Sequence, residues 1–595
     1  MSRSPLFGSL RRALRIAALA SRKEVGAPSV DDMLGRAYTR RRFLRESALA
    51  TIGVSVGALG CRREPGSSPG QASSPSLSPS SSSSRIAVVG AGVAGLNAAY
   101  KLQQVGLRAR IFEGSERIGG RMFTATNLLG DGLTTELGGE FIDSTHEEML
   151  ALMMEFGLER LDTQAPEPAT LKPETYFING RHYTQAQAAR AFVPLARRIL
   201  ADYDSLGDVI DYKTDGGGSA FDRQSIAQYL DGLGATGWMW ELLDAAYVTE
   251  YGLDTGEQSA LNFVRLMGTG DLKDRAAFEL LGESDERYKV VGGNQKIVDE
   301  LAKRIEPQIQ RRHRLEAIRS KGQGFTLTFQ SDRGIVDEDA DVVVLAIPFT
   351  LLRDMRMQVE LPAVKKKAIQ ELGYGANAKV LVGFRNRPWQ AQGYSGSTYT
   401  DEAFQLAWDN SFLQQGPSGG LTLYSGGKAA LAVGQGTAEA VAERLMTGIE
   451  RAYPGATAAR NGKVARFHWP TFPWTKGSYS CYKPGQWTTI AGAESEPVGN
   501  LFFAGEHCSY DFQGYMNGAA QSGADAARAV IAKLSVPKAV EWSVRGAQSA
   551  SSRSLRTPSA LRAAWLDADP SRPATASTAA VTSSTNAQAG APYRR

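Results

Sequence analysis

Between residues 85 and 535, short apolar runs alternate with longer runs of helix-forming residues. Ile86 to Val89 is a short, β-branched run that predicts a strand buried on both faces, and Val93 to Gln104 has a helix-forming composition with few breakers. A second apolar run, Ala109 to Phe112, predicts another strand after that helix. The pattern therefore predicts an α/β unit of strand, tight turn, helix and strand.

Two later stretches have a different pattern. Residues 145–285 contain helical runs such as HEEMLALMMEFGL and SIAQYLDGLGATGWMWELLDAAYVTEYG. Residues 375–470 mix strand-like runs, such as AKVLVGF and GGLTLYSGG, with helices. We expect the Trp and Met side chains of the helical part to pack in a core. Together the two stretches predict a second domain of α+β type, and clefts between domains commonly hold ligands.

Glycines stand at the turn of the first α/β unit. Gly90, Gly92 and Gly95 allow a sharp reversal, close approach of a pyrophosphate to the backbone, and tight packing of helix on strand. The helix N-terminus would then face the phosphates. Glu113 ends the second strand, 18 residues after Gly95, where an acidic side chain can bind a ribose. The pattern indicates the adenosine end of NAD or FAD.

Composition separates the two ends of the chain from the rest. Residues 62–84 and 545–595 are rich in Ser, Ala, Pro and Thr, so we expect a disordered linker and a disordered tail. The net charge is +5, but residues 1–60 alone hold 11 Lys or Arg against 4 Asp or Glu. The remainder is therefore slightly acidic, and we expect no nucleic-acid partner.

Residues 1–61 are typical of an export signal. TRRRFLR, at residues 39–45, precedes a weakly apolar segment that is too short to span a bilayer, and this resembles a twin-arginine signal. That route carries folded proteins, so we expect the export machinery as a partner and a periplasmic or cell-envelope location. Cys61 stands where a lipoprotein would be cleaved and lipidated, and the sequence leaves both a lipid anchor and soluble release open.

Metal chemistry has no support in the sequence. The other two cysteines, Cys481 and Cys508, have no metal-binding spacing, and the 5 histidines form no ligand cluster. A Cys481–Cys508 disulfide is open outside the cytoplasm, because spacing does not fix its geometry. The oligomeric state, a homodimer included, is also open.

A resemblance to a known family begins just after Glu113. RIGGR, which holds Arg117, Gly120 and Arg121, and ELGGE, which holds Gly138 and Gly139, resemble the FAD-binding front end of flavin-dependent amine oxidases of the monoamine oxidase and L-amino acid oxidase type. Backbone amides and a guanidinium suit a pyrophosphate. The family often has a second Arg where this chain has Ser115, so pyrophosphate contacts are expected to be fewer.

Three further segments continue the resemblance in the family's order. They are residues 288–305, residues 340–355 and residues 500–530. In the third, a strand leads into Gly505 and Glu506, and a loop delivers Tyr515 and Met516 to a helix start. The resemblance implies that Glu506 contacts the ribityl and phosphate region and that this helix N-terminus meets the flavin pyrimidine.

The resemblance also implies the fold. We expect an α/β protein with a Rossmann-like FAD-binding domain of the GR2 type and an interleaved α+β substrate domain. The expected domain ranges are listed here: the FAD-binding domain takes residues 85–144, 286–350 and 490–535, and the substrate domain takes residues 145–285 and 351–489.

Three residues match catalytic positions of the family. Lys379 matches a lysine that reaches a water beside flavin N5, where a cation can stabilise negative charge. Tyr479 and Tyr515 match two aromatic residues that flank the substrate nitrogen, because electron-rich faces can align an amine. Either tyrosine alone is more typical of packing, whereas the pair favours a functional role.

Two departures from the family refine the expectation. Members with covalently attached flavin have a cysteine where this chain has Ser478, and Cys481 is out of register, so we expect noncovalent FAD. L-amino acid oxidases usually follow the second glycine motif with Met-Arg, whose guanidinium holds the substrate carboxylate. Here Glu140 and Phe141 follow, which favours an amine over an α-amino acid.

The expected activity is oxidative deamination. An amine would be oxidised to an imine and then to an aldehyde and ammonia, with oxygen reduced to hydrogen peroxide. An L-amino acid oxidase is the first alternative. A non-catalytic flavin-binding scaffold and a flavin-dependent desaturase are further alternatives, against which Lys379 and the two tyrosines argue.

Overall fold

The structure is a computed structural model, and it describes residues 84–164, 171–172, 174–267 and 285–534. The predicted twin-arginine signal, Cys61, almost all of the Ser/Pro linker and the C-terminal tail lie outside the described residues. Across the described part, none of the helices is both long enough and apolar enough to cross a membrane.

A five-stranded parallel sheet forms the centre of the nucleotide-binding half. Its strands, in spatial order, are β20 (Leu501–Phe503), β13 (Val342–Leu345), β1 (Ile86–Val89), β2 (Ala109–Phe112) and β9 (Ile309–Gln310). Ile86 pairs with Val342 on one side and with Ala109 on the other, which makes β1 the middle strand. All four residues of β1 are buried, as its continuous apolar run predicts.

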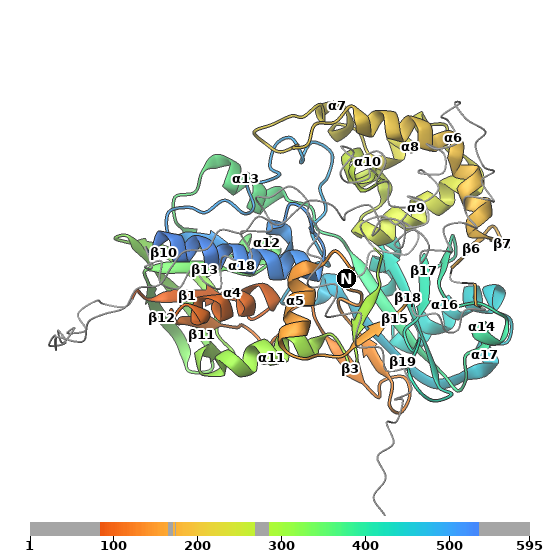
Figure 1. Cartoon of the computed structure of the whole chain (residues 1–595), viewed down its shortest axis with the longest axis horizontal. Helices are drawn as coiled ribbons and strands as arrows, with labels where there is room; N and C mark the ends of the chain where they lie inside the picture. The colour runs from red at the N-terminus through yellow and green to blue at the C-terminus, as the bar shows by residue number, and fades with distance from the viewer. Residues whose placement is uncertain (1–83, 165–170, 173, 268–284, 535–595) are drawn as a thin grey trace, which may run out of the picture. The chain divides into compact units, whose positions relative to one another are not determined.

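The two faces of this sheet are covered differently. Ile86 and Val88 pack with four helices: α4 (Val93–Gln104), α5 (Glu147–Glu155), α11 (Gln295–Ile305) and α18 (Met516–Lys533). Ala87 and Val89 face a core shared with a second sheet, whose order is β12 (Gly334–Ala340), β11 (Gly324–Ser331), β10 (Arg314–Lys321) and β14 (Arg356–Gln358). Figure 1 shows α4 and α18 side by side, and the two helices are in contact.

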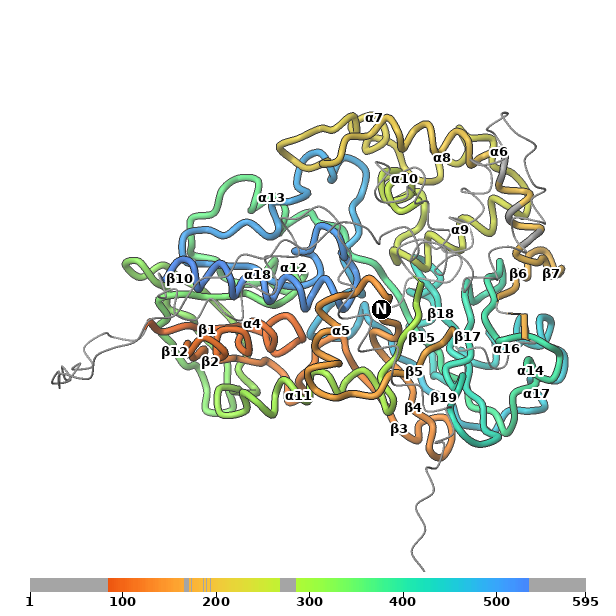
Figure 2. Tube along the Cα trace, in the orientation of Figure 1, coloured from red at the N-terminus to blue at the C-terminus, as the bar shows by residue number. Residues whose placement is uncertain are grey.

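A seven-stranded sheet organises the other half. Its order is β19 (Arg460–His468), β15 (Asn377–Phe384), β18 (Gly419–Gly426), β17 (Leu406–Asp409), β16 (Thr398–Thr400), β6 (Thr175–Ile178) and β7 (Arg181–Tyr183). Every neighbouring pair is antiparallel except β16 and β6. Figure 2 traces β15, β17, β18 and β19 running together through this half.

Helices cover both faces of the seven-stranded sheet. One face packs against α16 (Ala438–Ala452) and α15 (Gly427–Val433), and the other packs against α6 (Gln185–Asp204), α8 (Ile226–Gly232), α9 (Gly237–Tyr251) and α10 (Ala260–Met267). Strand β15 alternates between these faces: Ala378 and Val380 enter the first core, and Lys379 lies on the opposite face.

Shorter elements complete the described chain. Two small ladders are β3 (Thr124–Thr126) with β4 (Thr134–Glu136) and β5 (Arg160–Asp162) with β8 (Tyr288–Val290). The short helices are α7 (Ser219–Asp222), α12 (Phe349–Leu352), α13 (Ala363–Glu371), α14 (Pro388–Ala391), α17 (Ala456–Ala459), η1 (Thr255–Glu257), η2 (Glu306–Gln308), η3 (Trp469–Thr471) and η4 (Glu506–Cys508).

The predicted α/β architecture with a Rossmann-like unit is confirmed, but one predicted boundary needs correction. The expected substrate domain begins at residue 145, which would include α5. Instead, Met149, Leu152 and Met153 of α5 are buried in the core that α4 and α18 form. Helix α5 therefore belongs to the nucleotide-binding half, because its apolar stripe is buried there.

Candidate active site

A long cleft runs along the nucleotide-binding half. It encloses about 1080 Å³ of empty space, which includes open solvent at its mouth. It is lined by the predicted catalytic residue Tyr515 and by these predicted cofactor residues: Gly90, Gly92, Glu113, Arg117, Gly120, Arg121, Gly505, Glu506 and Met516. The other predicted cofactor residues contact the backbone of lining residues: Gly95 packs on Gly90, and Gly138 and Gly139 pack on Arg121.

The turn after β1 requires glycine at two positions. Gly90 has φ +104°, and a Cβ there would lie 2.6 Å from the carbonyl oxygen of Ala346. A Cβ on Gly95 would lie 1.9 Å from the carbonyl oxygen of Gly90. Both distances are shorter than any tolerable contact, so the backbone can pass this closely only without side chains.

Two helix N-termini point their backbone amides at the cleft. Helix α4 begins after Gly92 and α18 begins after Tyr515; in neither case does a described side chain cap the helix or an acidic residue occupy its first turn. The first-turn amides of each helix are thus left without a capping side chain, which favours an anionic ligand.

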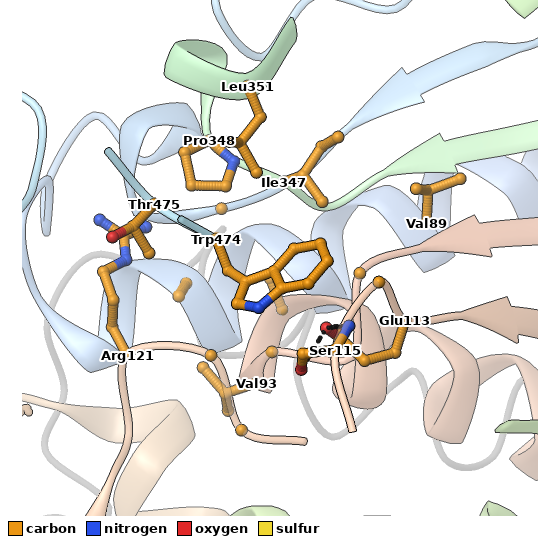
Figure 3. A pocket seen from close by; sticks show the side chains of 18 of the residues that line it. Val89, Val93, Glu113, Ser115, Arg121, Ile347, Pro348, Leu351, Trp474 and Thr475 are labelled. Carbon is orange, nitrogen blue, oxygen red and sulfur yellow. Dashed lines mark hydrogen bonds between the residues drawn. The ribbon is translucent and has the colours of Figure 1, made fainter. Parts of the chain in front are cut away.

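Glu113 is held in one orientation at the end of β2. Its Oε2 accepts a hydrogen bond from the amide of Ala91 at 2.9 Å, and its Oε1 accepts bonds from the amide and hydroxyl of Ser115, both at 2.8 Å. Figure 3 shows the Glu113–Ser115 contact at the cleft. Ser115, where the family often has Arg, thus fixes the predicted ribose-binding carboxylate.

Arg117 bonds to its own loop. Its guanidinium donates to the carbonyl oxygens of Ile118 at 2.8 Å and Met122 at 3.0 Å, and also to that of Gly120. It also lies over the Phe123 ring, 4.1 Å from the centroid. In this arrangement Arg117 shapes the double-glycine turn that lines the cleft.

Arg121 and Glu506 join the two halves of the molecule. Arg121 donates to Glu506 Oε1 and to the carbonyl oxygen of Ser478, both at 2.8 Å, while Ser480 and the amide of Gly514 donate to Glu506 Oε2. Burial alone would raise the pKa of Glu506, but the charge of Arg121 and the hydrogen bonds lower it below its usual value. Glu506 therefore stays ionised.

Gly138 and Gly139 pack against the backbone of Arg121. The amide of Gly139 donates to the Arg121 carbonyl oxygen at 3.0 Å, and a Cβ on Gly138 would lie 1.9 Å from that same oxygen. The Gly138-Gly139 pair thus holds the backbone of the segment that contains Gly120 and Arg121 in place.

Lys379 is buried, with 1% of its surface exposed, so it is not a solvent-facing lysine at a strand edge. Its Nζ donates to the carbonyl oxygens of Glu136 and Gly138 and to Glu140 Oε2, each at 2.9 Å. These three acceptors engage all three ammonium hydrogens. The predicted contact with a water beside the flavin stays a prediction.

Glu140 lies between two lysines. Lys289 donates to its Oε1 at 2.9 Å, opposite Lys379 on Oε2. Burial would raise the pKa of Glu140, but the two ammonium charges outweigh it and lower the pKa to about 2. Lys379, Glu140 and Lys289 together carry two positive charges and one negative.

Tyr479 and Tyr515 are both buried, and each is fixed by a neighbour. The Tyr479 hydroxyl donates to the carbonyl oxygen of Thr249 at 2.9 Å and lies 3.2 Å from the Tyr424 hydroxyl. Tyr424 is the cross-strand partner of Lys379, so Lys379 and Tyr479 belong to one connected group. The ring of Tyr515 packs edge-on against His146, with centroids 5.0 Å apart.

A match to a known protein family agrees with this arrangement. The sequence profile of the family described as "Flavin containing amine oxidoreductase" matches residues 93–531. The chain belongs to this family. It is therefore an FAD-dependent oxidoreductase that acts on amines, as its sequence predicts.

Relatives in the amine oxidoreductase family are distant. The flavin-containing amine oxidase of Oncorhynchus mykiss is 25% identical, over 77% of this chain and 88% of its own length. The flavin-dependent L-tryptophan oxidase RebO of Lentzea aerocolonigenes is 27% identical, over 75% of this chain and 98% of its own. The structure of cyclohexylamine oxidase from Brevibacterium oxydans has a TM-score of 0.67 at 22% identity and covers 76% of this chain and 100% of its own.

The cleft of this amine oxidoreductase fits FAD. The glycine turn that a Cβ would fill and the two uncapped helix N-termini are the features that a dinucleotide's phosphates and a flavin's pyrimidine oxygen require. Gly90, Gly92 and the α4 N-terminus would hold the pyrophosphate, Glu113 the ribose, and the α18 N-terminus at Met516 the flavin ring.

Trp474 was missed from the sequence. Its indole points into the cleft near Glu113 and Ser115 (Figure 3), and it lies so close to the backbone of Gly114 that a Cβ there would be 2.3 Å from the ring. Trp474 stands in the run WTKGSYSCY, five residues before Tyr479. This short distance in the sequence from Tyr479 was the only hint that Trp474 belongs to the site. It is a weak hint, because a single tryptophan is more often a core residue.

Ser478 and Cys481, on which the prediction of noncovalent FAD rests, are both buried. The Ser478 hydroxyl donates to Asn377 Oδ1 at 2.5 Å, and Cys481 is buried in the core that α9 and α10 line. No disulfide joins Cys481 to Cys508, both of which lie within the described residues. The described residues also contain no cluster of His, Cys, Asp and Glu that could hold a metal ion.

Proposed function

We propose that the protein oxidises a neutral amine held between Tyr479 and Tyr515, with oxygen as the electron acceptor. The products are an imine, which water converts to an aldehyde and ammonia, and hydrogen peroxide. The observation that carries the proposal is the pair of buried tyrosines, of which Tyr515 lines the cleft and Tyr479 closely follows the lining residues Trp474 and Thr475 in the chain. FAD, when bound, supplies the two-electron acceptor.

The residues of this chain orient the amine and supply charge. The tyrosine rings would present their electron-rich faces to the nitrogen, which favours partial positive charge on the substrate. The Thr249 carbonyl and Tyr424 prevent Tyr479 from turning away, so the amine meets a preorganised surface. Lys379 adds a fixed positive charge that can stabilise anionic oxygen species.

Glu140 does not decide between amines and amino acids by its own charge, because two lysines neutralise it. Lys289, whose side chain is 12% exposed, could even attract a substrate carboxylate. This observation keeps an L-amino acid oxidase as the second candidate.

Anaerobic titration separates the candidates. If the proposal is right, aliphatic amines should bleach the flavin absorbance and L-amino acids should not, and admission of air should restore the colour with release of peroxide. Bleaching by amino acids alone would establish the second candidate, and bleaching by neither class would point to a scaffold.

We also propose that FAD is held without a covalent bond. The hydroxyl of Ser478, which replaces the expected cysteine, supports this. Acid precipitation should therefore release intact FAD into the supernatant, and yellow colour that stays in the pellet would contradict the proposal.

Export is proposed from the sequence alone. Arg40, Arg41 and the short apolar segment before Cys61 support delivery to the periplasm or cell envelope by the twin-arginine machinery, with or without a lipid anchor. Replacing both arginines by Lys should leave active, FAD-loaded enzyme in the cytoplasm. An unimpaired variant would mean that the signal has been misread.

A further inference from the structure

Glu140 takes part of the effect of the Lys379 charge away. It directly follows the Gly138-Gly139 pair, is completely buried, and accepts a hydrogen bond from Lys379 Nζ at 2.9 Å. A pair of one lysine and one carboxylate has no net charge. Such a pair acts on its surroundings only as a dipole, whose effect falls with distance faster than that of a single charge.

Lys289 changes this balance. Its Nζ donates to the other carboxylate oxygen of Glu140, Oε1, at 2.9 Å. Among the residues that the structure describes, Glu140 is the only acid within ion-pair distance of Lys379 or Lys289. One carboxylate therefore serves two ammonium groups, and the group of Lys379, Glu140 and Lys289 keeps a net charge of +1.

The nearest further acid does not cancel this charge at mildly acidic pH. Glu136, whose carbonyl oxygen binds Lys379, is 1% exposed, and burial raises the pKa of its carboxyl to about 7. At pH 6, about nine in ten Glu136 carboxyls are therefore protonated and neutral. Burial and surrounding acids also raise the pKa of Glu286 well above its usual value, so this carboxyl favours its neutral form too.

The charged group lies directly behind a wall of the cleft. Lys379 Nζ donates to the carbonyl oxygen of Gly138, and Gly138 packs on the backbone of Arg121, which lines the cleft. Two buried aromatic residues border the same ammonium: the Trp408 ring, whose centroid lies 5.2 Å from Nζ, and Tyr424, the cross-strand partner of Lys379. Such surroundings screen charge weakly, so a net charge here acts over about 10 Å.

These observations assign a role to Glu140 and Lys289. We propose that both are positioning residues that act through Lys379: Glu140 fixes its ammonium group, and Lys289 offsets the charge of Glu140. The cleft wall then keeps one net positive charge, which stabilises reduced, anionic flavin and anionic oxygen species. The inference rests on the proposed function, in which Lys379 supplies a fixed charge beside bound FAD.

The first test measures the midpoint potential of the bound flavin and needs no amine. The holoenzyme is titrated with a reductant against a reference dye at pH 6, which gives the ratio of reduced to oxidised flavin at each potential. Lys289→Met lowers the net charge of the group to zero, and this ratio should fall on the order of 10-fold, a shift of about 30 mV. Glu140→Gln removes the negative charge, and the ratio should rise by a similar factor.

The opposite signs separate a charge effect from a structural one. Loss of packing has no reason to reverse sign between the two variants, so shifts in the same direction, or no shift in either, would overturn the proposal. The double variant Lys289→Met with Glu140→Gln restores the net charge of the group, and its midpoint potential should return close to the wild-type value.

Two further variants are the controls. Lys289→Arg keeps the charge and should have the wild-type midpoint potential. Exposed Lys366→Met removes one positive charge from the surface and should leave the midpoint potential unchanged. A shift in Lys366→Met as large as that in Lys289→Met would show that only the total charge of the protein matters, which contradicts the proposal.

Folding and the proposed function are checked separately. If Glu140→Gln does not fold, Lys289→Met and Lys289→Arg still decide, because equal midpoint potentials in these two variants would contradict the proposal. If the potentials shift as expected but no amine bleaches the flavin anaerobically, it is the proposed function that fails. If amines bleach the flavin and the potentials do not shift, only the present inference fails.

Discussion

At the scale of single residues, the group of Lys379, Glu140 and Lys289 connects stability with chemistry. Its members are buried, or nearly so, and each ion pair is 2.9 Å long. Removal of one partner from such a group leaves an uncompensated charge, which typically destabilises a protein by about 3–5 kcal/mol. Substitutions here should therefore change both the unfolding temperature and the kinetics.

Lys379→Met should slow the reaction of the reduced enzyme with oxygen more than the reaction with amine. Anionic oxygen species need a fixed cation, and the loss of one such interaction costs about 3 kcal/mol, on the order of a hundredfold in rate. Stopped-flow flavin absorbance follows the two half-reactions separately, and exposed Lys366→Met is the control. Oxidation by oxygen at the wild-type rate would remove Lys379 from this role.

Glu140 predicts a pH dependence of stability. Its folded pKa is about 2, below the ordinary 4.5, so its contribution is fully present above the ordinary value and is lost as pH falls through the folded value. The difference in urea midpoint between wild type and Glu140→Gln should therefore shrink as pH is lowered from about 5 to about 3. A constant difference across this range would show that Glu140 does not titrate as described.

At the scale of elements, the turn between β1 and α4 shows how close backbone packing positions the cofactor site. Gly95 lies in the first turn of α4, and its Cα faces the carbonyl oxygen of Gly90. Because Gly95 has no side chain, α4 can pack closely against β1. This packing directs the N-terminal amides of α4 toward the cleft.

Gly95→Ala should abolish flavin binding. An added methyl group would lie 1.9 Å from the Gly90 oxygen, so α4 must move away from β1. The purified variant should lack absorbance near the flavin maximum. Gly232→Ala, where a Cβ meets nothing within 4 Å, is the matched control and should stay yellow. A yellow Gly95→Ala protein would mean that the turn tolerates the shift.

At the scale of the whole molecule, the local parts of the site could be predicted and the long-range parts could not. The glycine turn and Glu113 lie within one short α/β unit, so spacing alone identifies them. Glu140 and Lys379 are 239 positions apart, and no local pattern indicates that they pair. For the same reason, nothing in the sequence indicated that two lysines bind Glu140.

The placement of α5 follows the same logic. Its apolar stripe predicts burial, but the identity of the partner depends on α18, which lies hundreds of residues later. Trp474 is similar, because only the folded chain brings its loop to Gly114. Tertiary contacts of this kind carry no signature in residue spacing.

Glu506 binds Ser480, which follows Tyr479, and Gly514, which precedes Tyr515, and Glu506→Gln tests the importance of these contacts. The amide cannot pair fully with Arg121, so the Tyr479 and Tyr515 segments should lose their common anchor. We expect FAD affinity to fall on the order of tenfold or more, the usual cost of one charged hydrogen bond. Fluorescence of released FAD on dilution measures it, and unchanged retention would contradict the role.

The strands of the parallel sheet are far apart in the sequence, so the ribosome makes them at different times. β1 is made first, but its neighbour β13 follows only at Val342–Leu345, the next strand, β20, only at Leu501–Phe503, and α18 ends at Lys533. At a translation rate of about 5–20 residues per second, the cleft is complete only roughly 30 to 100 s after synthesis begins. The first nucleotide-binding strand must remain soluble for that time before its sheet, and with it the cofactor site, can close.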